Sequence, residues 1–504
     1  MSETGLDRAA LAARLPDPAA TDGIEVDPSF DDLRSYSAHL ETTTEHGSPA
    51  YVSEFRSRCA ERTRDTVDHE FDADDRALVG DAVDAVADPG DREFVAVDRV
   101  VGRHPEVAQV CRLFVPKEYG RIALAWAKLL EPAPEGAEPD LQTVQLPDAG
   151  EPAIRVLVGE GLTVVRGSDY TGEAKKSFLR LFMRRAKEAG GLGLHAGSKR
   201  VVLDDADGRR EVGQLFLGLS GTGKSTLTGH RLWLEAPEYA ELLQDDVCAL
   251  LPDGTVAGGE GAGLYIKTHG LAAEEQPALH DAATDSSAVL ENVVVDGDGR
   301  VNFDDGTLTR NGRAVVERAA LPSAADDVDL SGADQVFFIT RNRLMPPVAR
   351  LDDDQAAAAF MLGESVQTSA GDPDAAGERL RVVGTNPFVV GPAGAEGNRF
   401  RELVADNDVD CFLLNTGSVG DADVRVDDTV ALLESLARGA VEWRHDETVG
   451  LAVPDAAPGV DLDRLNPLAS VEDYAAKVAE LRAERREYLA GFPELDDAVV
   501  DAAY

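Results

Sequence analysis

The sequence predicts an α/β fold with more than one domain, and three observations support this. The chain has 504 residues, which is enough for two or more domains that each bury a core of their own. Apolar residues make up 43% of it, as expected for a globular protein. Short apolar runs typical of strands alternate with longer segments typical of helices, and one such run, residues 215–217, leads directly into a glycine-rich segment.

This glycine-rich segment, GLSGTGKST, fits the pattern G-x-x-x-x-G-K-[ST] of phosphate-binding loops. Its glycines let backbone N–H groups point at phosphate oxygens, and the helix expected to follow adds a positive N-terminal end. The lysine reaches the terminal phosphates and the serine can hold a divalent cation. We expect nucleotide contacts from Gly218, Leu219, Ser220, Gly221, Thr222, Gly223, Lys224, Ser225 and Thr226. The motif does not identify the chemistry, because kinases, ATPases and GTPases share it, and an ordinary glycine-rich turn is the alternative.

The charge balance is strongly acidic. The chain has 93 Asp and Glu residues against 49 Lys and Arg, for a net charge of −44. Nucleic acids and anionic membranes both require positive surfaces, so neither is expected as a partner. Only nine of the basic residues are lysines. Acidic excess with scarce lysine is typical of proteins that stay folded in molar salt, where repulsion among the acids is screened, so we infer a halophilic origin.

The remaining composition indicates a cytoplasmic protein. The four cysteines are scattered and form no C-x-x-C pair, which predicts a reduced compartment without a disulfide framework or a zinc site. The N-terminus is polar and acidic, unlike a signal peptide. No apolar run approaches the ~20 residues that span a bilayer.

Periodicity predicts the main elements in chain order. Residues 1–50 have little periodicity, and we expect this segment to be partly mobile. We predict strands at 94–101, 110–115, 199–203, 213–217, 239–246, 291–295, 335–339 and 410–415, and helices at 121–130, 168–189, 352–362 and 471–489. The predicted strands 199–203 and 213–217 form a hairpin that delivers the chain to the phosphate loop.

Three further features of the sequence are candidates for catalytic or metal-binding roles. Lys175 and Lys176 are adjacent; they either belong to a solvated basic helix face, or one lowers the pKa of the other to give a neutral amine that can act as a base or metal ligand. A lone histidine such as His195 is more often structural than a ligand. Asp245 and Asp246 end a predicted strand; they are either surface acids or hold the metal of the nucleotide.

The order of these motifs resembles one family, the ATP-dependent phosphoenolpyruvate carboxykinases. The resemblance covers residues 97–439 and rests on Y-x-G-E-x-K-K at 170–176, His195, GLSGTGKST, Q-D-D at 244–246, the glycine cluster up to Lys267, LENVVVDGDGRVNFDDGTLT, MPPVARL and LLNTG. It implies two domains with the active site in the cleft between them: an N-terminal substrate-binding domain, 1–190, of mixed α+β structure, and a C-terminal domain, 191–504, that binds nucleotide and metal. It also implies conversion of oxaloacetate and ATP into phosphoenolpyruvate, CO2 and ADP, through an enolate that a divalent metal stabilises.

The resemblance assigns roles residue by residue. Mn²⁺ would be bound by Lys176, His195 and Asp246, and Mg²⁺ by Ser225 with the nucleotide, beside Asp245. Lys224 and Lys267 would neutralise the phosphates, with Arg313 orienting the γ-phosphoryl group. Tyr170 would lie near the carboxyl group that is lost, and Arg56 is the nearest candidate for the substrate carboxylate. The remaining nucleotide contacts would come from Glu291, Arg425 and Thr429.

One argument for catalysis does not depend on the family. Four of the nine lysines, Lys175, Lys176, Lys224 and Lys267, fall in the proposed site, although the chain otherwise avoids lysine. Two alternatives stay open from the sequence. One is another phosphate-loop kinase, which would consume ATP without decarboxylation. The other is an ATP-binding regulatory protein with negligible turnover.

Overall fold

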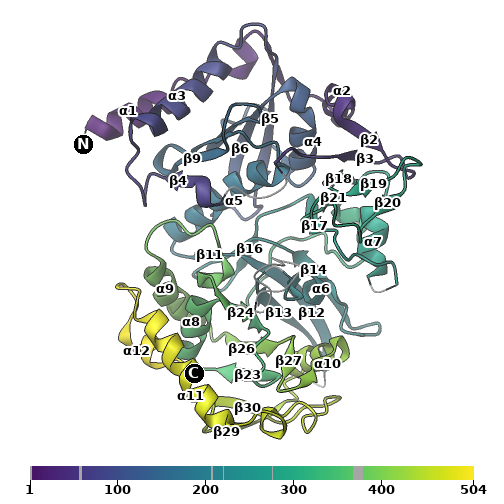
Figure 1. Cartoon of the computed structure of the whole chain (residues 1–504), viewed down its shortest axis with the longest axis vertical. Helices are drawn as coiled ribbons and strands as arrows, with labels where there is room; N and C mark the ends of the chain where they lie inside the picture. The colour runs from purple at the N-terminus through teal and green to yellow at the C-terminus, as the bar shows by residue number, and fades with distance from the viewer. Residues whose placement is uncertain (1–2, 56–59, 206–207, 220, 275, 367–378) are drawn as a thin grey trace. The chain divides into compact units, whose positions relative to one another are not determined.

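The computed structural model describes residues 3–55, 60–205, 208–219, 221–274, 276–366 and 379–504 (Figure 1). Contacts divide the chain into two compact units. Unit 1 comprises Met1–Arg185 and Gly259–Pro322, and unit 2 comprises Ala186–Gly258 and Ser323–Tyr504. The units therefore alternate along the chain, with residues 259–322 returning to unit 1. The expected functional division at residue 190 stays a prediction.

The helices of the described residues fall into two sets. Those of unit 1 are α1 Glu3–Ala12, α2 Phe30–Tyr36, α3 Ala73–Ala87, α4 Gly120–Ala127 and α7 Pro277–Ala283. Those of unit 2 are α6 Lys224–Gly229, α8 Asp353–Leu362, α9 Ala393–Asp406, α10 Val426–Ala437, α11 Tyr474–Leu489 and α12 Asp497–Asp501. Helix α5, Thr171–Glu188, spans the boundary in sequence.

Unit 1 is built on a large mixed sheet with the strand order β1-β5-β6-β8-β10-β9-β4, to which β7 adds beside β5. The strands are β1 Ile24–Val26, β4 Thr63–Asp65, β5 Phe94–Val101, β6 Gln109–Pro116, β7 Glu131–Pro132, β8 Leu141–Leu146, β9 Ala153–Leu157 and β10 Leu162–Arg166. Val79, Val83 and Val86 recur at helical spacing on α3 and pack into one core with Phe94, Phe114 and Val144 of the sheet.

A second sheet of unit 1 has the order β17-β21-β18-β3-β2. Its strands are β2 Glu41–Thr43, β3 Pro49–Tyr51, β17 Gly263–Lys267, β18 Val289–Glu291 and β21 Arg313–Glu317. It thus joins segments from both ends of unit 1. The described part of the segment 1–50, expected to be partly mobile, contains two α-helices, two short 3₁₀ helices, strands β1 and β2 and the start of β3.

The predicted strand 291–295 is interrupted. Strand β18 ends at Glu291, and β19, Val294–Val295, pairs instead with β20, Val301–Asn302. Asn292 between them has φ 60°, a left-handed conformation that asparagine tolerates better than most residues. Its side chain accepts a hydrogen bond from the N–H of Ser53 at 2.7 Å. The long-range contact between Asn292 and Ser53 therefore interrupts the strand that the apolar run alone predicts.

Unit 2 is built on an eight-stranded sheet with the order β14-β12-β13-β22-β26-β23-β30-β29. Its strands are β12 Ala196–Asp205, β13 Gly208–Leu217, β14 Tyr239–Gln244, β22 Gln335–Thr340, β23 Val348–Leu351, β26 Asp410–Asn415, β29 Glu442–Asp446 and β30 Leu451–Ala456. Strands β13, β22 and β26 run parallel, and β12 and β13 form the predicted hairpin.

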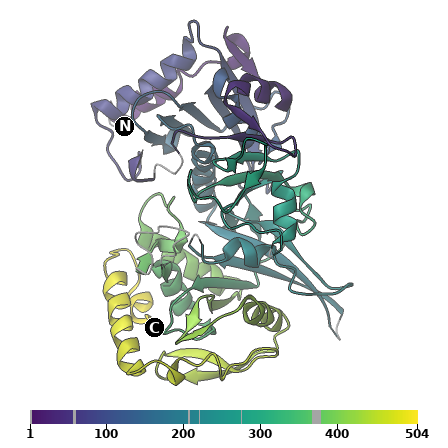
Figure 2. The ribbon, with the colours of Figure 1, turned by 45° about the vertical axis from the view of Figure 1, so that its right-hand side comes forward.

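Alternating side chains place a core on each face of this sheet. Leu215 and Leu217 pack with α8, α9, α11 and α12, whereas Phe216 between them packs with α6 and α10. Figures 1 and 2 show these helices on the two sides of the sheet. Smaller pairings complete unit 2: β11 Leu192–Leu194 with β15 Cys248–Leu250 and β16 Val256–Gly258, β24 Glu364–Val366 with β25 Arg379–Arg381, and β27 Ser418–Val419 with β28 Ala422–Asp423.

The strands and helices predicted from residue 94 onward are otherwise confirmed, with shifts of a few residues at their ends. Within the described part of the chain, the helices are all too short or too polar to traverse a bilayer.

Candidate functional site

The glycine-rich loop connects β13 to α6, as the sequence predicts. Gly221 and Gly223 have φ 83° and 98°, which side chains rarely allow. A Cβ on Gly218 would lie 2.6 Å from Thr222 Oγ1, so the turn also needs glycine there. Thr222 Oγ1 donates to the carbonyl of Leu219 at 2.7 Å, which ties the loop to itself. Ser220 lies outside the described residues.

Lys224 is the first residue of α6, and its side chain is aimed at the end of β14. Its Nζ atom is buried without a hydrogen-bond acceptor and lies 4.0 Å from Asp246 Oδ1. Asp245 Oδ1 is also buried without a hydrogen-bond donor. Ser225 is exposed beside them and Thr226 is half-buried. A cation near Asp245 and an anion near Lys224 would satisfy these groups, because an unpaired buried polar atom is costly.

His195 joins this group from the turn between β11 and β12. Its Nε2 atom lies 3.0 Å from Asp246 Oδ1, and its Nδ1 atom lies 2.6 Å from the carbonyl oxygen of Thr385. The carbonyl can only accept, so Nδ1 carries a proton. In the neutral ring, Nε2 then presents a lone pair to a carboxylate oxygen. That arrangement requires a second proton or a metal ion between the two atoms, and an Nδ1–H bonded to a carbonyl is common in metal-binding histidines.

In unit 1, Lys267, Arg313 and Glu291 occupy one register row across β17, β21 and β18. Paired residues of adjacent strands face the same side of the sheet, so these three side chains are neighbours. Burial, with Arg313 and Arg310 nearby, lowers the pKa of Lys267 to about 8. The row therefore holds two cations and one carboxylate.

Tyr170 is linked to Arg313 of this row through the side chain of Asn311. Its hydroxyl accepts a hydrogen bond from Asn311 Nδ2 at 3.2 Å, and Asn311 Oδ1 accepts from Arg313 Nη2 at 3.0 Å. The rings of Tyr170 and Tyr265 lie 6.4 Å apart. Asn311 thus couples the predicted catalytic tyrosine to the predicted phosphate-orienting arginine.

Glu291 is fully engaged inside unit 1. Its carboxylate accepts from Tyr265 Oη at 2.5 Å, the N–H of Thr171 at 2.9 Å, Ser53 Oγ at 3.2 Å and Arg121 Nη1 at 3.3 Å. These donors come from four separate segments. This geometry favours a positioning role for Glu291, while the nucleotide contact expected from the sequence stays a prediction.

Arg121 was missed by the sequence reasoning. It is buried, and its Nη2 atom donates to Asp169 Oδ2 at 2.7 Å. The Asp169 carboxylate also accepts the N–H groups of Glu54 and Phe55, both at 3.0 Å. It therefore positions the chain just before Arg56, which itself lies outside the described residues. A single arginine within the apolar helix GRIALAWA was the available signal.

The adjacent lysines of α5 differ in their surroundings. Lys175 Nζ lies 2.9 Å from Glu260 Oε2, and both side chains are buried. Lys176 is half-buried on the next position. Glu260 thus pairs with the charge of Lys175, while the predicted effect of one lysine on the other stays a prediction. The alternative of a wholly solvated basic face is wrong for Lys175.

Arg425 is the N-cap of α10, and Thr429 lies in the first turn of this helix. Arg425 is exposed, and its backbone N–H donates to Asp428 Oδ2 at 2.8 Å. Thr429 is buried and its hydroxyl donates to the carbonyl of Arg425 at 3.2 Å. The side chain of Arg425 is thus accessible to a nucleoside, whereas the hydroxyl of Thr429 is already bonded within the helix.

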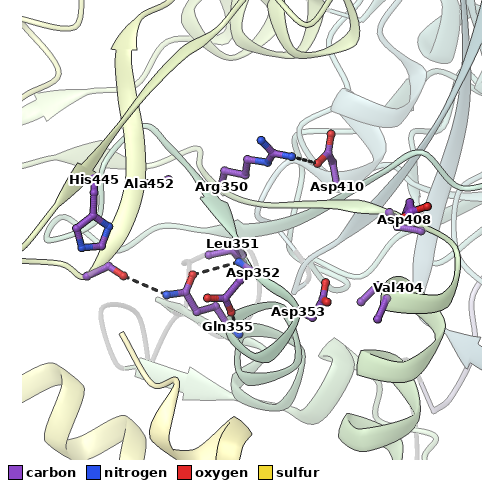
Figure 3. A pocket seen from close by; sticks show the side chains of 13 residues that line it. Arg350, Leu351, Asp352, Asp353, Gln355, Val404, Asp408, Asp410, His445 and Ala452 are labelled. Atoms are coloured by element: carbon purple, nitrogen blue, oxygen red, sulfur yellow. Dashed lines mark hydrogen bonds and ion pairs between the residues drawn. The ribbon is translucent and has the colours of Figure 1, made fainter.

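A hollow of about 590 Å³ in unit 2 contains none of the predicted site residues (Figure 3). Asp352, Asp353 and Asp408 line it, with Arg350 paired to Asp410 at 2.6 Å. Across all described residues, no three His, Cys, Asp or Glu side chains are arranged to hold a metal ion. A metal at His195 and Asp246 would therefore need another kind of third ligand, such as an amine or water.

A strand, a glycine-rich loop and a helix that begins with lysine are typical of phosphate-binding loops. The model of the phosphoenolpyruvate carboxykinase family matches residues 65–463. Phosphoenolpyruvate carboxykinase (ATP) of Aeropyrum pernix is 38% identical over 478 residues, 94% of this chain and 95% of that protein. The corresponding proteins of Afipia carboxidovorans and Bradyrhizobium diazoefficiens are each 33% identical, over 68% and 62% of this chain and 64% and 58% of their own lengths. The chain belongs to the ATP-dependent phosphoenolpyruvate carboxykinase family.

Proposed function

We propose that this protein converts oxaloacetate and ATP into phosphoenolpyruvate, CO2 and ADP. Family membership supports this reaction over the kinase and regulatory alternatives. The observation in the structure that supports it best is the grouping of Lys224, His195 and Asp246 beside the glycine-rich loop. A loop that holds a phosphoryl donor then lies next to residues suited to a divalent cation.

The phosphate loop would bind ATP. Backbone N–H groups of residues 218–223 and the N-terminal end of α6 would hold its phosphates, and Lys224 would neutralise their charge. Arg425 would contact the nucleoside from the start of α10. The chain's part in phosphoryl transfer is therefore to position the donor and neutralise its charge.

The donor set of the site fits divalent metals. Mn²⁺ would be held by His195 and Asp246 with Lys176 as a nitrogen ligand, and Mg²⁺ by Ser225 with the nucleotide, near the unsatisfied oxygen of Asp245. When bound, such a cation stabilises negative charge that develops on the substrate. Thr385 orients the ring of His195 through its backbone carbonyl.

Unit 1 would act on the same substrates. Lys267 and Arg313 carry positive charge for the phosphoryl group and Tyr170 would contact the carboxyl group that leaves as CO2. Asp169 holds the backbone before Arg56, the candidate for binding the substrate carboxylate. Arg121 and Glu291 would keep these segments in place.

An assay of the full chain tests the function directly. Purified protein in molar KCl with oxaloacetate, ATP, Mg²⁺ and Mn²⁺ should form phosphoenolpyruvate, CO2 and ADP in equal amounts. ADP formation without CO2 would indicate a kinase instead. ATP binding without turnover, in folded protein, would indicate the regulatory alternative.

The lowered pKa of Lys267 predicts a pH dependence. Deprotonation above about pH 8 removes a positive charge in the free enzyme, so KM for ATP should rise between pH 7 and pH 9. Lys267→Arg keeps its charge over this range and should flatten that rise. Lys117→Arg, at a surface ion pair with Glu25, is the control and should behave like wild type. An equal rise in Lys267→Arg would refute the assignment.

The acidic composition predicts salt dependence. With a net charge of −44, the folded chain is destabilised by self-repulsion at low ionic strength, so Tm should rise as KCl is raised to molar concentration. Calorimetry across a KCl series measures this, and sucrose, which stabilises without screening, is the control. A Tm that is unchanged by KCl would contradict a halophilic protein.

A further inference from the structure

Lys199 is a fully buried lysine that does not belong to the proposed substrate, nucleotide or metal ligands. It lies on β12, paired with Gln214 of β13 on one side and Leu242 of β14 on the other. Strand β13 leads into the phosphate loop, and strand β14 leads to Asp245 and Asp246. Its exposure is 0%, and burial lowers the pKa of its amine to about 7. A buried ammonium group is costly, and lysine is scarce in this chain, so its presence here calls for a specific contact.

That contact is the C-terminal end of α6. Lys199 Nζ donates to the backbone carbonyl of Leu227, in the last turn of the helix, and at 2.8 Å to that of His230, which follows it. The last carbonyls of a helix have no intrahelical donors, and a cation there interacts favourably with the helix dipole. The same helix begins with Lys224 and Ser225.

Helix α6 depends on such contacts because it is short. It has six residues, and isolated helices of that length are not stable in water. It also lies directly against β12, since a Cβ on Gly197 would clash with Thr228 Oγ1. Fixing one end of so short a helix therefore fixes the other end.

We propose that Lys199 is a positioning residue for nucleotide binding. Its Nζ atom, which donates to two backbone carbonyls, anchors the C-terminal end of α6 to β12 and thereby holds Lys224 and Ser225 in the geometry that receives the ATP phosphates. This inference rests on the proposed function, in which the loop binds ATP. It assigns the buried lysine to the donor half of the reaction, not to the binding of oxaloacetate.

Lys199→Met tests the inference, because methionine has a similar length and no donor. KM for ATP should rise at least tenfold while KM for oxaloacetate stays within twofold of wild type. Lys199→Gln keeps an amide NH2 group as a donor. Its KM for ATP should lie between the values for wild type and Lys199→Met. Lys477→Met, which removes an exposed lysine of α11, is the control and should match wild type.

The outcomes separate the possibilities. A lower Tm with both KM values unchanged would mean that Lys199 only stabilises the fold, and an equal rise in both KM values would mean general distortion; either result overturns the inference. If Lys199→Met does not fold, the ratio of the two KM values in Lys199→Gln decides. Absence of ATP binding and turnover in the wild type would instead refute the proposed function.

Discussion

Asp246→Asn should lower kcat for phosphoenolpyruvate formation by about 10²–10³-fold, the usual effect of removing one electrostatic group from a catalytic site. The carboxylate lies 3.0 Å from His195 Nε2 and 4.0 Å from Lys224 Nζ, so it contributes to both the expected metal site and the phosphate site. An amide keeps the shape but carries no charge and is a weaker metal ligand. Steady-state assays at saturating ATP and oxaloacetate measure the change.

Two comparisons make this result specific. His195→Ala and Lys176→Ala should each lower kcat by a similar factor if the three side chains share one cation. Asp463→Asn makes the same chemical change at an exposed position of unit 2 and should leave kcat unaltered. Wild-type rates in Asp246→Asn would refute the metal assignment.

Arg485→Met should lower the free energy of unfolding by about 3 kcal/mol, because it breaks a buried ion pair and leaves charge behind. Arg485 is 1% exposed; its Nη2 atom donates to Glu364 Oε1 and its Nη1 atom to the carbonyl of Tyr504, both at 2.7 Å. It also stacks on the ring of Tyr504 at 4.5 Å. Arg485 therefore connects α11, β24 and the C-terminal residue, and denaturant unfolding in molar KCl would measure the loss.

The buried ion pair between Arg485 and Glu364 also predicts that the fold loses stability in acid. Burial alone would raise the pKa of Glu364, but Arg485 and Arg381 lower it to about 2. A carboxyl group with a lowered folded-state pKa stabilises the fold above its ordinary pKa of about 4.3, and this stability is lost as the pH falls towards 2. Arg485→Met should weaken that dependence. Arg486→Met, at an exposed neighbour, should change stability by less than about 0.5 kcal/mol, and a loss equal to that of Arg485→Met would contradict the buried-pair argument.

Local patterns predicted most of the fold of unit 2. The run 215–217 followed by glycines is both a strand signal and a loop signal, and the structure confirms the strand and the following helix. The apolar runs 335–339 and 410–415 are strands because buried parallel strands are apolar on both faces. His195 and Asp246 were predicted to belong to one site, and their side chains lie 3.0 Å apart although 51 positions separate them; their role stays a prediction. That grouping came from the resemblance, since no local pattern relates the two.

Only the tertiary structure showed which buried polar residues pair around the proposed site. Arg121, Asp169 and Glu291 meet although they are distant in sequence, and no local pattern predicts the contact of Lys199 with α6. By itself the sequence determined the glycine-rich loop, the order of the motifs, the acidic composition and most strands, because these depend on composition and on neighbours along the chain. The tertiary structure decided which buried charges are paired and which segments form unit 1, because long-range contacts leave no periodic signal in the sequence.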